Sequence, residues 1–156
     1  MKYTRLTKEQ LEELHQEFIN FLATQSITAD EWNTLKTEKP AVAEQEIDVF
    51  SDLVWEGVLN QASYLENISP SHMYLFHLGE DQMKLIAVKI LKEGIDITTK
   101  EGFAWLRDNY STEEVEILTA NKAYSDDRNG DKFALLQQGS NITKGQLFQW
   151  FDAMMS

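Results

Sequence analysis

The sequence predicts an α+β fold with N-terminal helices, then a small three-stranded antiparallel sheet, then C-terminal helices. In residues 1–60 and 98–156, apolar side chains recur every three or four positions, which is the period of an amphipathic helix. In residues 62–91 the period changes to two and aromatic and β-branched residues become frequent, as is typical of strands. No linker rich in Gly, Pro or Ser divides the chain, so we expect residues 1–156 to form a single globular domain.

Helix starts are marked four times by one pattern, a Ser or Thr followed three residues later by Glu or Gln and flanked by apolar residues. In such a capping box each side chain bonds a backbone N–H group that the first helical turn leaves without a partner. The four boxes begin at Thr7, Thr28, Ser111 and Thr143. They predict helices that start one residue after each of these positions.

Three helices are predicted in the N-terminal segment. The first runs from about Lys8 to Thr24, and the second runs from Ala29 to the region of Pro40. Proline cannot donate a hydrogen bond to the preceding turn, so a new helix is expected to begin there. This third helix extends to about Asn60, and its broad apolar stripe indicates a central place in the core.

Three strands are predicted in the middle of the chain, at Tyr64–Ile68, Met73–Leu78 and Met83–Ile90. The short breaks between them favour an antiparallel meander. Both faces of this sheet carry apolar side chains. We therefore expect helices to cover one face, and either helices or a partner to cover the other.

The C-terminal segment is predicted to return to helices, although residues 115–137 allow two interpretations. Thr98 or Thr99 caps one helix, and a final helix begins at Lys144. Between them, the box at Ser111 favours two helices separated by a polar loop. The Asn129-Gly130 pair is instead a hairpin signal that would make strands of the same residues. We prefer the two helices.

The composition of the chain restricts its partners. The 156 residues include 14 Lys and Arg against 26 Asp and Glu, a net charge of −12, and residues 1–60 alone carry −7. Because phosphate binding needs clustered Lys and Arg, this balance argues against nucleic acids and anionic membranes, and it favours a protein partner with a basic surface. No apolar stretch approaches the about 20 residues of a membrane span, and neither a secretory signal nor a cysteine is present. We expect a cytoplasmic protein.

Three segments resemble an uncharacterised family of small acidic bacterial proteins: KYTRLTKEQLEELHQEFINFLA, SITADEW and FALLQQGSNITKGQLF. The resemblance is better at the two ends of the chain than in its middle. It implies a bacterial cytosolic protein, and it brings no activity and no site residues with it.

The residue pattern predicts no metal, no cofactor and no catalytic residue. Of the three histidines, His72 and His77 have opposite strand parity and so point to opposite faces, while His15 borders an apolar helix face. Neither a phosphate-binding glycine loop nor a nucleophile elbow is present. An enzyme is therefore the less favoured hypothesis.

Two sets of residues remain as functional candidates. Polar side chains near the predicted sheet would bind a small ligand in a pocket between sheet and helices: His77, Glu66, Tyr74 and Arg107. Aromatic side chains beside the helical stripes would form an interface: Trp105, Trp150 and Phe148. The leading hypothesis is a non-enzymatic interaction or regulatory module, such as an inhibitor that blocks a basic cleft. The alternative is a ligand-binding protein or enzyme that uses the pocket, and a homo-oligomer through the sheet or the last helix is a further possibility.

Overall fold

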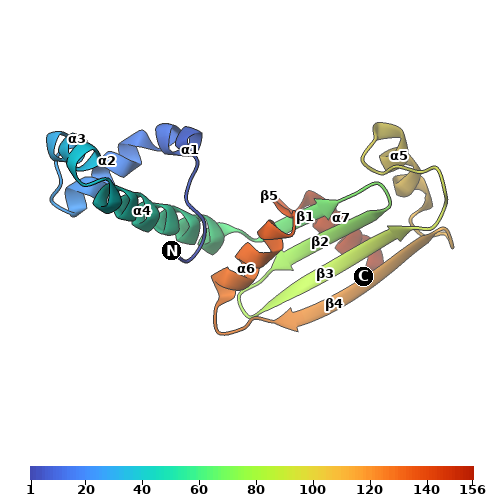
Figure 1. Cartoon of the computed structure of the whole chain (residues 1–156). Coiled ribbons are helices and arrows are strands. Elements are labelled where there is room, and N and C mark those ends of the chain that lie inside the picture. Colours follow the sequence, from blue (N-terminus) through green and yellow to red (C-terminus); the bar gives the residue numbers. More distant parts are fainter. The chain divides into compact units, whose positions relative to one another are not determined.

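The structure, a computed structural model, describes residues 1–156 and belongs to the α+β class, as predicted (Figure 1). It divides into two compact units, residues 1–60 and residues 61–156, which we call the helical unit and the sheet unit. The helices are α1 (Lys8–Glu13), α2 (His15–Thr24), α3 (Ala29–Glu38), α4 (Pro40–Gln61), α5 (Lys100–Asn109), α6 (Arg128–Gln137) and α7 (Gln146–Met155). The strands are β1 (Tyr64–Ile68), β2 (His72–Leu78), β3 (Gln82–Ile90), β4 (Val115–Ala123) and β5 (Asn141–Thr143). None of the helices combines the length and the apolar composition that crossing a bilayer requires.

The helix starts of the helical unit are confirmed. Thr7 and Gln10 form a complete capping box, and Thr28 Oγ1 accepts a hydrogen bond from Glu31 N at 3.1 Å. α4 begins at Pro40, where proline fits the first turn of a helix. These starts depend on residues adjacent in sequence, which is why the sequence alone predicts them.

The prediction of a single helix over residues 8–24 is wrong in one respect, because the structure divides this segment at Leu14. The backbone there, with φ −99° and ψ 24°, leaves the helical region. α1 contributes no buried side chain, whereas α2 buries Phe18, Phe21 and Leu22. The second piece is therefore anchored by three buried side chains, whereas α1 contacts the core only through the partly buried Leu11.

Aromatic rings form the core of the helical unit. The ring of Phe18 lies edge-on to Trp32 with centroids 5.1 Å apart, and it is tilted against Phe50 at 5.0 Å. Phe21 also packs on Phe50, at 5.5 Å. α2, α3 and α4 thus meet around Phe50, which is 4% exposed.

The N-terminal segment of the chain is bound along α4 by carboxylates. The backbone N–H groups of Lys2 and Tyr3 donate to the Asp52 carboxylate at 2.8 and 3.0 Å. One turn earlier on α4, Asp48 accepts from Arg5 Nε at 2.6 Å. This guanidinium lowers the pKa of the Asp48 carboxyl below its ordinary value. Part of the acidic charge of residues 1–60 is thus used within the unit.

The sheet unit contains the three predicted strands, but the prediction of a three-stranded sheet is wrong. The sheet has five antiparallel strands in the order β4-β3-β2-β1-β5. The central meander β1-β2-β3 lies where sequence periodicity places it. The two outer strands come from the segment predicted as helical, and each pairs with a strand distant in sequence.

Helices lie on both faces of the sheet. Met73, Leu75 and Val88 share one face, where they form a core with α5 and α7. On the opposite face, Leu65 and Leu78 pack against side chains of α6. The expectation that both faces are covered is therefore confirmed, although α6 leaves Tyr74 and part of β4 exposed.

The preferred interpretation of residues 115–137 as two helices is wrong for its first half. The capping pattern at Ser111 starts no helix, because the following residues pair with β3 along the whole of β4. The Asn129-Gly130 pair also makes no hairpin. Asp127 caps α6 by accepting from Gly130 N at 3.1 Å, so this pair lies in the first turn of a helix. The segment is therefore one strand followed by one helix.

The last predicted helix start is displaced by strand pairing. Thr143 lies in β5 opposite Tyr64, and its Oγ1 accepts from Gly145 N rather than from Gln146. Gly145 is the N-cap, with φ 81°. A Cβ at this position would also lie 2.3 Å from Cγ of Tyr64, so only glycine fits the corner between β5 and α7.

Candidate functional site

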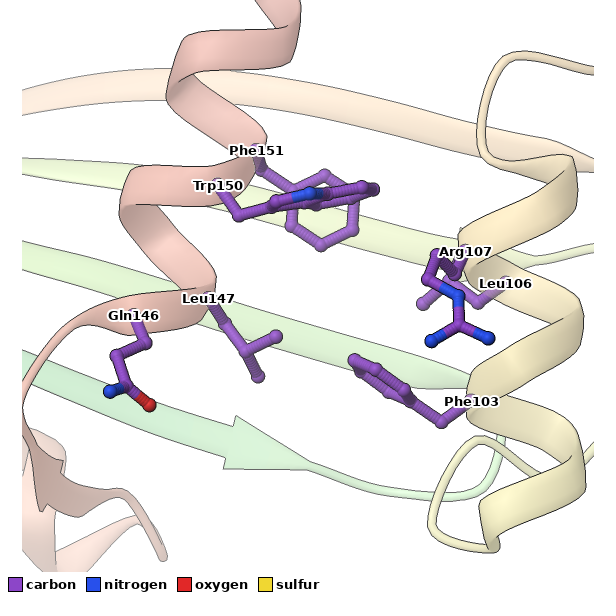
Figure 2. A pocket seen from close by; sticks show the side chains of 7 residues that line it. All are labelled: Phe103, Leu106, Arg107, Gln146, Leu147, Trp150 and Phe151. Carbon is purple, nitrogen blue, oxygen red and sulfur yellow. The ribbon is translucent and has the colours of Figure 1, made fainter.

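The candidate site is an apolar groove in the sheet unit, between α5 and α7. Its volume is about 300 Å³, at the lower end of the range for small-molecule sites. Figure 2 shows side chains from the two helices facing each other across it. The lining residues are Phe103, Leu106, Arg107, Gln146, Leu147, Trp150 and Phe151. We call this site the α5/α7 groove.

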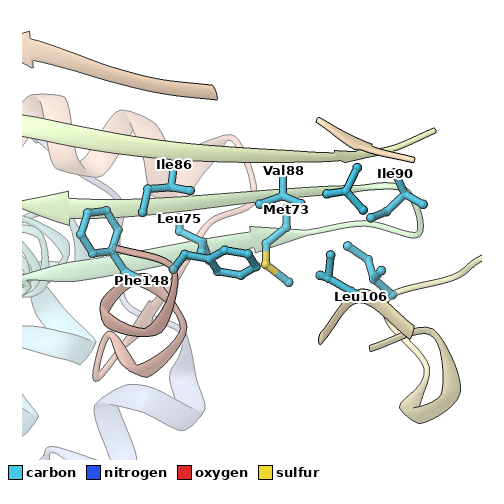
Figure 3. Packing of buried hydrophobic residues seen from close by; sticks show 10 residues of the cluster. Met73, Leu75, Ile86, Val88, Ile90, Leu106 and Phe148 are labelled. Carbon is cyan, nitrogen blue, oxygen red and sulfur yellow. The ribbon is translucent and has the colours of Figure 1, made fainter. Parts of the chain in front are cut away.

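The base of the α5/α7 groove is continuous with the sheet core. Leu106 and Phe151 line the groove and are both 1% exposed. Figure 3 shows Leu106 of α5 beneath the side chains of β2 and β3, among them Met73 and Val88. Because interiors of this kind are close-packed, the base is rigid and presents a fixed apolar surface.

Local structure at the start of α5 fixes the first wall of the groove. Thr99 Oγ1 accepts from Gly102 N at 3.0 Å and so caps the helix, one of the two caps predicted from the sequence. Upstream, the hydroxyl and the backbone N–H of Thr98 both donate to Asp96, which lowers the pKa of that carboxyl. Gly102 lies so close to the Asp96 carbonyl that a Cβ would be 1.7 Å from its oxygen. α5 is thereby held against the loop that precedes it.

Trp150 forms the opposite wall, on α7. Its ring is edge-on to Tyr110 at 5.2 Å and to Phe151 at 4.8 Å. These contacts hold the indole beside the groove while leaving part of it accessible, since Trp150 is only half-buried. Half-buried Trp is common at binding surfaces because it offers a large apolar area with little conformational entropy to lose.

The polar groups of the groove are Arg107 and Gln146, which are both exposed at its rim. In Figure 2 the guanidinium of Arg107 extends from α5 into the space between the helices. None of the ion pairs of the chain involves Arg107. The groove therefore has an apolar interior with one guanidinium and one carboxamide at its mouth, on a chain whose net charge is −12.

This arrangement can bind, but it contains no reactive group. The lining lacks a nucleophilic hydroxyl, a histidine and a carboxylate. No group of three or more His, Asp and Glu side chains is placed to hold a metal ion anywhere in the chain. A guanidinium is charged at all ordinary pH values, so it recognises anions rather than transferring protons.

The structure does not bring the four predicted ligand-binding residues together. Glu66 and His77 share the sheet face covered by α5 and α7, where His77 stacks on Tyr64 at 4.8 Å. Tyr74 lies on the opposite face, 37% exposed, and stacks on His72 at 6.1 Å. Arg107 alone reaches the α5/α7 groove.

The three predicted interface aromatics differ in exposure. Phe148 is 5% exposed and belongs to the sheet core. Trp105 is half-buried on α5, with Lys92 Nζ 5.8 Å from the centroid of its ring. Trp150 lines the groove together with Arg107, so the groove contains one residue from the predicted ligand-binding set and one from the predicted interface set.

Sequence reasoning missed Phe103, Gln146 and Leu147 as groove residues. Phe103 and Leu147 lie on apolar stripes, which predict core positions, and Gln146 completes the capping pattern that begins at Thr143. The available signal was that Phe103 and Leu147 each stand at the beginning of their helix. Helix ends that converge over a sheet leave such residues half-buried.

Comparison with known proteins identifies a family without assigning an activity. The whole chain, residues 1–156, matches the model described as "Family of unknown function (DUF6495)". No curated protein and no solved structure matches the chain. The protein therefore belongs to the DUF6495 family, as the resemblance of its terminal segments to an uncharacterised family predicted.

Proposed function

We propose that this member of the DUF6495 family is a non-catalytic binding module of the bacterial cytoplasm. Its α5/α7 groove takes a small molecule with an apolar body and a single carboxylate. The observation that supports this proposal is the guanidinium of Arg107, which forms no ion pair and stands over an apolar groove in an acidic chain. The alternative hypothesis from the sequence, a small-ligand-binding protein, thus becomes the main proposal, with a groove between two helices as its site.

The chemistry of the rim favours a carboxylate. The planar guanidinium of Arg107 matches the two oxygens of a carboxylate and bonds them in parallel. Elsewhere the negative charge of the protein repels anions, so a local positive group is needed to receive one. Gln146 supplies a further donor for orienting the bound oxygen atoms.

The size and lining of the groove favour a short apolar body. A volume of about 300 Å³ accommodates a medium-length alkyl chain or one aromatic ring. Phe103, Leu147 and Trp150 would contact it, and burial contributes about 25 cal/mol for each Å² of apolar surface removed from water. Nucleotides fit poorly, because their phosphates need several clustered donors.

Calorimetric titration of the full chain with octanoate tests the proposal. Octanoate is expected to bind, and Arg107→Gln is expected to weaken it at least tenfold, since hydrogen bonds to charged groups contribute about 1.5–3 kcal/mol. The matched control is Lys100→Gln, which removes the same charge from the same helix at an exposed position outside the groove. A second ligand, 1-octanol, lacks the carboxylate and should bind both variants equally.

Three results would contradict the proposal. The first is that octanoate fails to bind. The second is that Arg107→Gln binds octanoate as well as the unaltered protein does, and the third is that Lys100→Gln loses as much affinity as Arg107→Gln. Equal loss in both variants would assign the effect to the general charge of the protein instead of to the groove.

A basic protein partner for the helical unit is a second candidate function. Four exposed carboxylates of α1 and α2 form no ion pair within the chain: Glu9, Glu12, Glu13 and Glu17. Affinity purification from the native cell at two salt concentrations should recover a basic protein that high salt releases. A Glu12→Gln, Glu13→Gln double variant should recover less of it. Equal recovery by this variant would contradict the hypothesis.

A further inference from the structure

β4 leaves one edge of the sheet open. It is nine residues long and pairs along its whole length with β3, and no strand lies on its other side. Figure 1 shows it as the outermost strand. All its residues from Leu118 onward are exposed, and Leu118 itself is 60% exposed. Strand edges of this length are templates for pairing unless proline, bulges, charged side chains or coverage blunt them. β4 contains no proline, and its two charged side chains, Glu116 and Lys122, have opposite signs.

The alternation of hydrogen-bonded residues along β4 shows which of its backbone groups face away from β3. Leu91 N donates to Glu114 O at 2.8 Å, so these two residues form a hydrogen-bonded pair between the β3 and β4 segments. Because such pairs alternate along antiparallel strands, the even-numbered residues of β4 direct their backbone N–H and C=O groups at β3. The odd-numbered residues direct theirs outward. Ile117, Thr119 and Asn121 are therefore available to another strand.

We propose that a second copy of this chain pairs with this edge, β4 against β4, antiparallel about a two-fold axis at Thr119. Thr119 is the middle residue of the strand, so this register pairs the two strands over their full length. It sets Thr119 opposite Thr119 of the second copy, and Ile117 opposite Asn121. All of these are residues with outward-facing backbone groups, so each N–H meets a C=O.

Charge complementarity on the side chains selects the same register. Centring on Thr119 sets Glu116 opposite Lys122 of the second copy, and by symmetry Lys122 opposite its Glu116. Both lie on one sheet face, together with the exposed Leu118, which meets Ala120. Moving the axis by one residue, to Leu118 or Ala120, or by two, to Ile117 or Asn121, removes both Glu116–Lys122 pairs and shortens the overlap. Opposite charges directly across a strand pair are favourable, and like charges are unfavourable.

The pairing closes on itself, which limits it to a dimer. A two-fold axis uses the same surface of each copy, so no edge of β4 is left to recruit a third chain. The other edge strand, β5, has only three residues and offers little template. The sheets of the two copies would become continuous through β4.

Sedimentation velocity of the full chain over a range of concentrations tests this proposal. The unaltered protein of 18.0 kDa is expected to approach twice that mass. Glu116→Lys and Lys122→Glu each set like charges opposite each other twice, and each should raise the dissociation constant about tenfold or more. The double variant Glu116→Lys, Lys122→Glu restores complementarity and should restore dimerisation.

A backbone variant supplies an independent check. Thr119→Pro removes an outward N–H that β3 does not use, so the sheet should persist while the dimer is lost. Thr119→Val keeps the N–H and should keep the dimer. A monomeric unaltered protein overturns the proposal. A dimer that the charge variants leave unchanged also overturns it, as does a failure of the double variant to restore the dimer. These two results do not depend on the folding of the proline variant.

Discussion

The helical unit and the sheet unit differ in how they use their polar side chains. In the helical unit, α4 directs Asp48 and Asp52 at the N-terminal segment, where Arg5 and backbone N–H groups bond them. In the sheet unit, Arg107 at the rim of the α5/α7 groove forms no ion pair. A charge satisfied within the chain stabilises the fold, whereas a charge without a partner is available to a ligand. Because Arg107 is a cation beside an apolar groove, the search for a small anionic ligand is directed to the sheet unit, whereas the unpaired carboxylates of α1 and α2 concern a basic protein partner.

Removing a core side chain from each unit should have the largest effect. Phe50→Ala leaves a cavity between Phe18 and Phe21, and we expect it to lower the free energy of unfolding by about 3–5 kcal/mol. Leu75→Ala in the sheet core should cost about 2–5 kcal/mol, since Leu75 is 0% exposed. Urea denaturation followed by circular dichroism measures both.

The control for the core variants is Val49→Ala on α4. Val49 is 51% exposed, so its truncation should change stability by less than about 0.5 kcal/mol. If Phe50→Ala proved as mild as this control, the aromatic cluster would not be the core of the helical unit.

Loss of the carboxylate that binds the N-terminal segment should be the next largest effect. Asp52→Ala removes the acceptor of the Lys2 and Tyr3 N–H groups, and we expect a loss of about 1–2 kcal/mol because the site is only partly buried. Glu46→Ala, on the same helix but without a hydrogen bond to its side chain, should be nearly neutral. Equal effects of the two variants in urea denaturation would mean that α4 does not hold the segment through Asp52.

Helix caps allow a direct comparison of local sequence signals between the units. Thr28→Ala and Thr99→Ala each remove a side chain that accepts a backbone N–H, and each should cost about 1 kcal/mol. Ser111→Ala removes a residue with the same sequence pattern that starts no helix, so its effect should be close to zero. Thermal unfolding of the three variants measures this, and a cost at Ser111 equal to that at Thr28 would contradict the assignment of β4 as a strand.

The smallest expected effect is a pH dependence from Asp48. Since Arg5 lowers its folded-state pKa below the unfolded value of about 3.9, the pair stabilises the fold above that pH. The stabilisation is lost as pH falls through the folded pKa. Titration of the carboxyl by NMR should show a raised pKa in Arg5→Gln and no change in Lys8→Gln, which removes a charge three residues further along the chain that does not contact Asp48. An unchanged pKa in Arg5→Gln would disprove the pairing.

The accuracy of the predicted helix starts depended on whether a distant strand pairs with the same residues. Thr28 and Pro40 act through neighbours in sequence, and the helix starts that they predict are confirmed. Ser111 and Thr143 carry equally good local signals, but strands distant in sequence pair with the residues beside them and displace the predicted helices. Local capping patterns are reliable where no remote strand competes for the same backbone groups.

The candidate site was predictable only in part for a related reason. Arg107 and Trp150 are predictable because their residue types are common in binding sites. Phe103 and Leu147 could not be separated from ordinary core residues, because the groove exists only where α5 and α7 meet over the sheet. No sequence pattern within either helix predicts that α5 and α7 lie side by side.

The most direct test of the central claim is the mapping of octanoate onto the full chain by NMR. Amide signals of α5 and α7 should shift saturably on titration with octanoate, and these shifts should be weaker in Arg107→Gln and unchanged in Lys100→Gln. Shifts confined to residues 1–60, or shifts of α5 and α7 that ignore the loss of Arg107, would contradict the account.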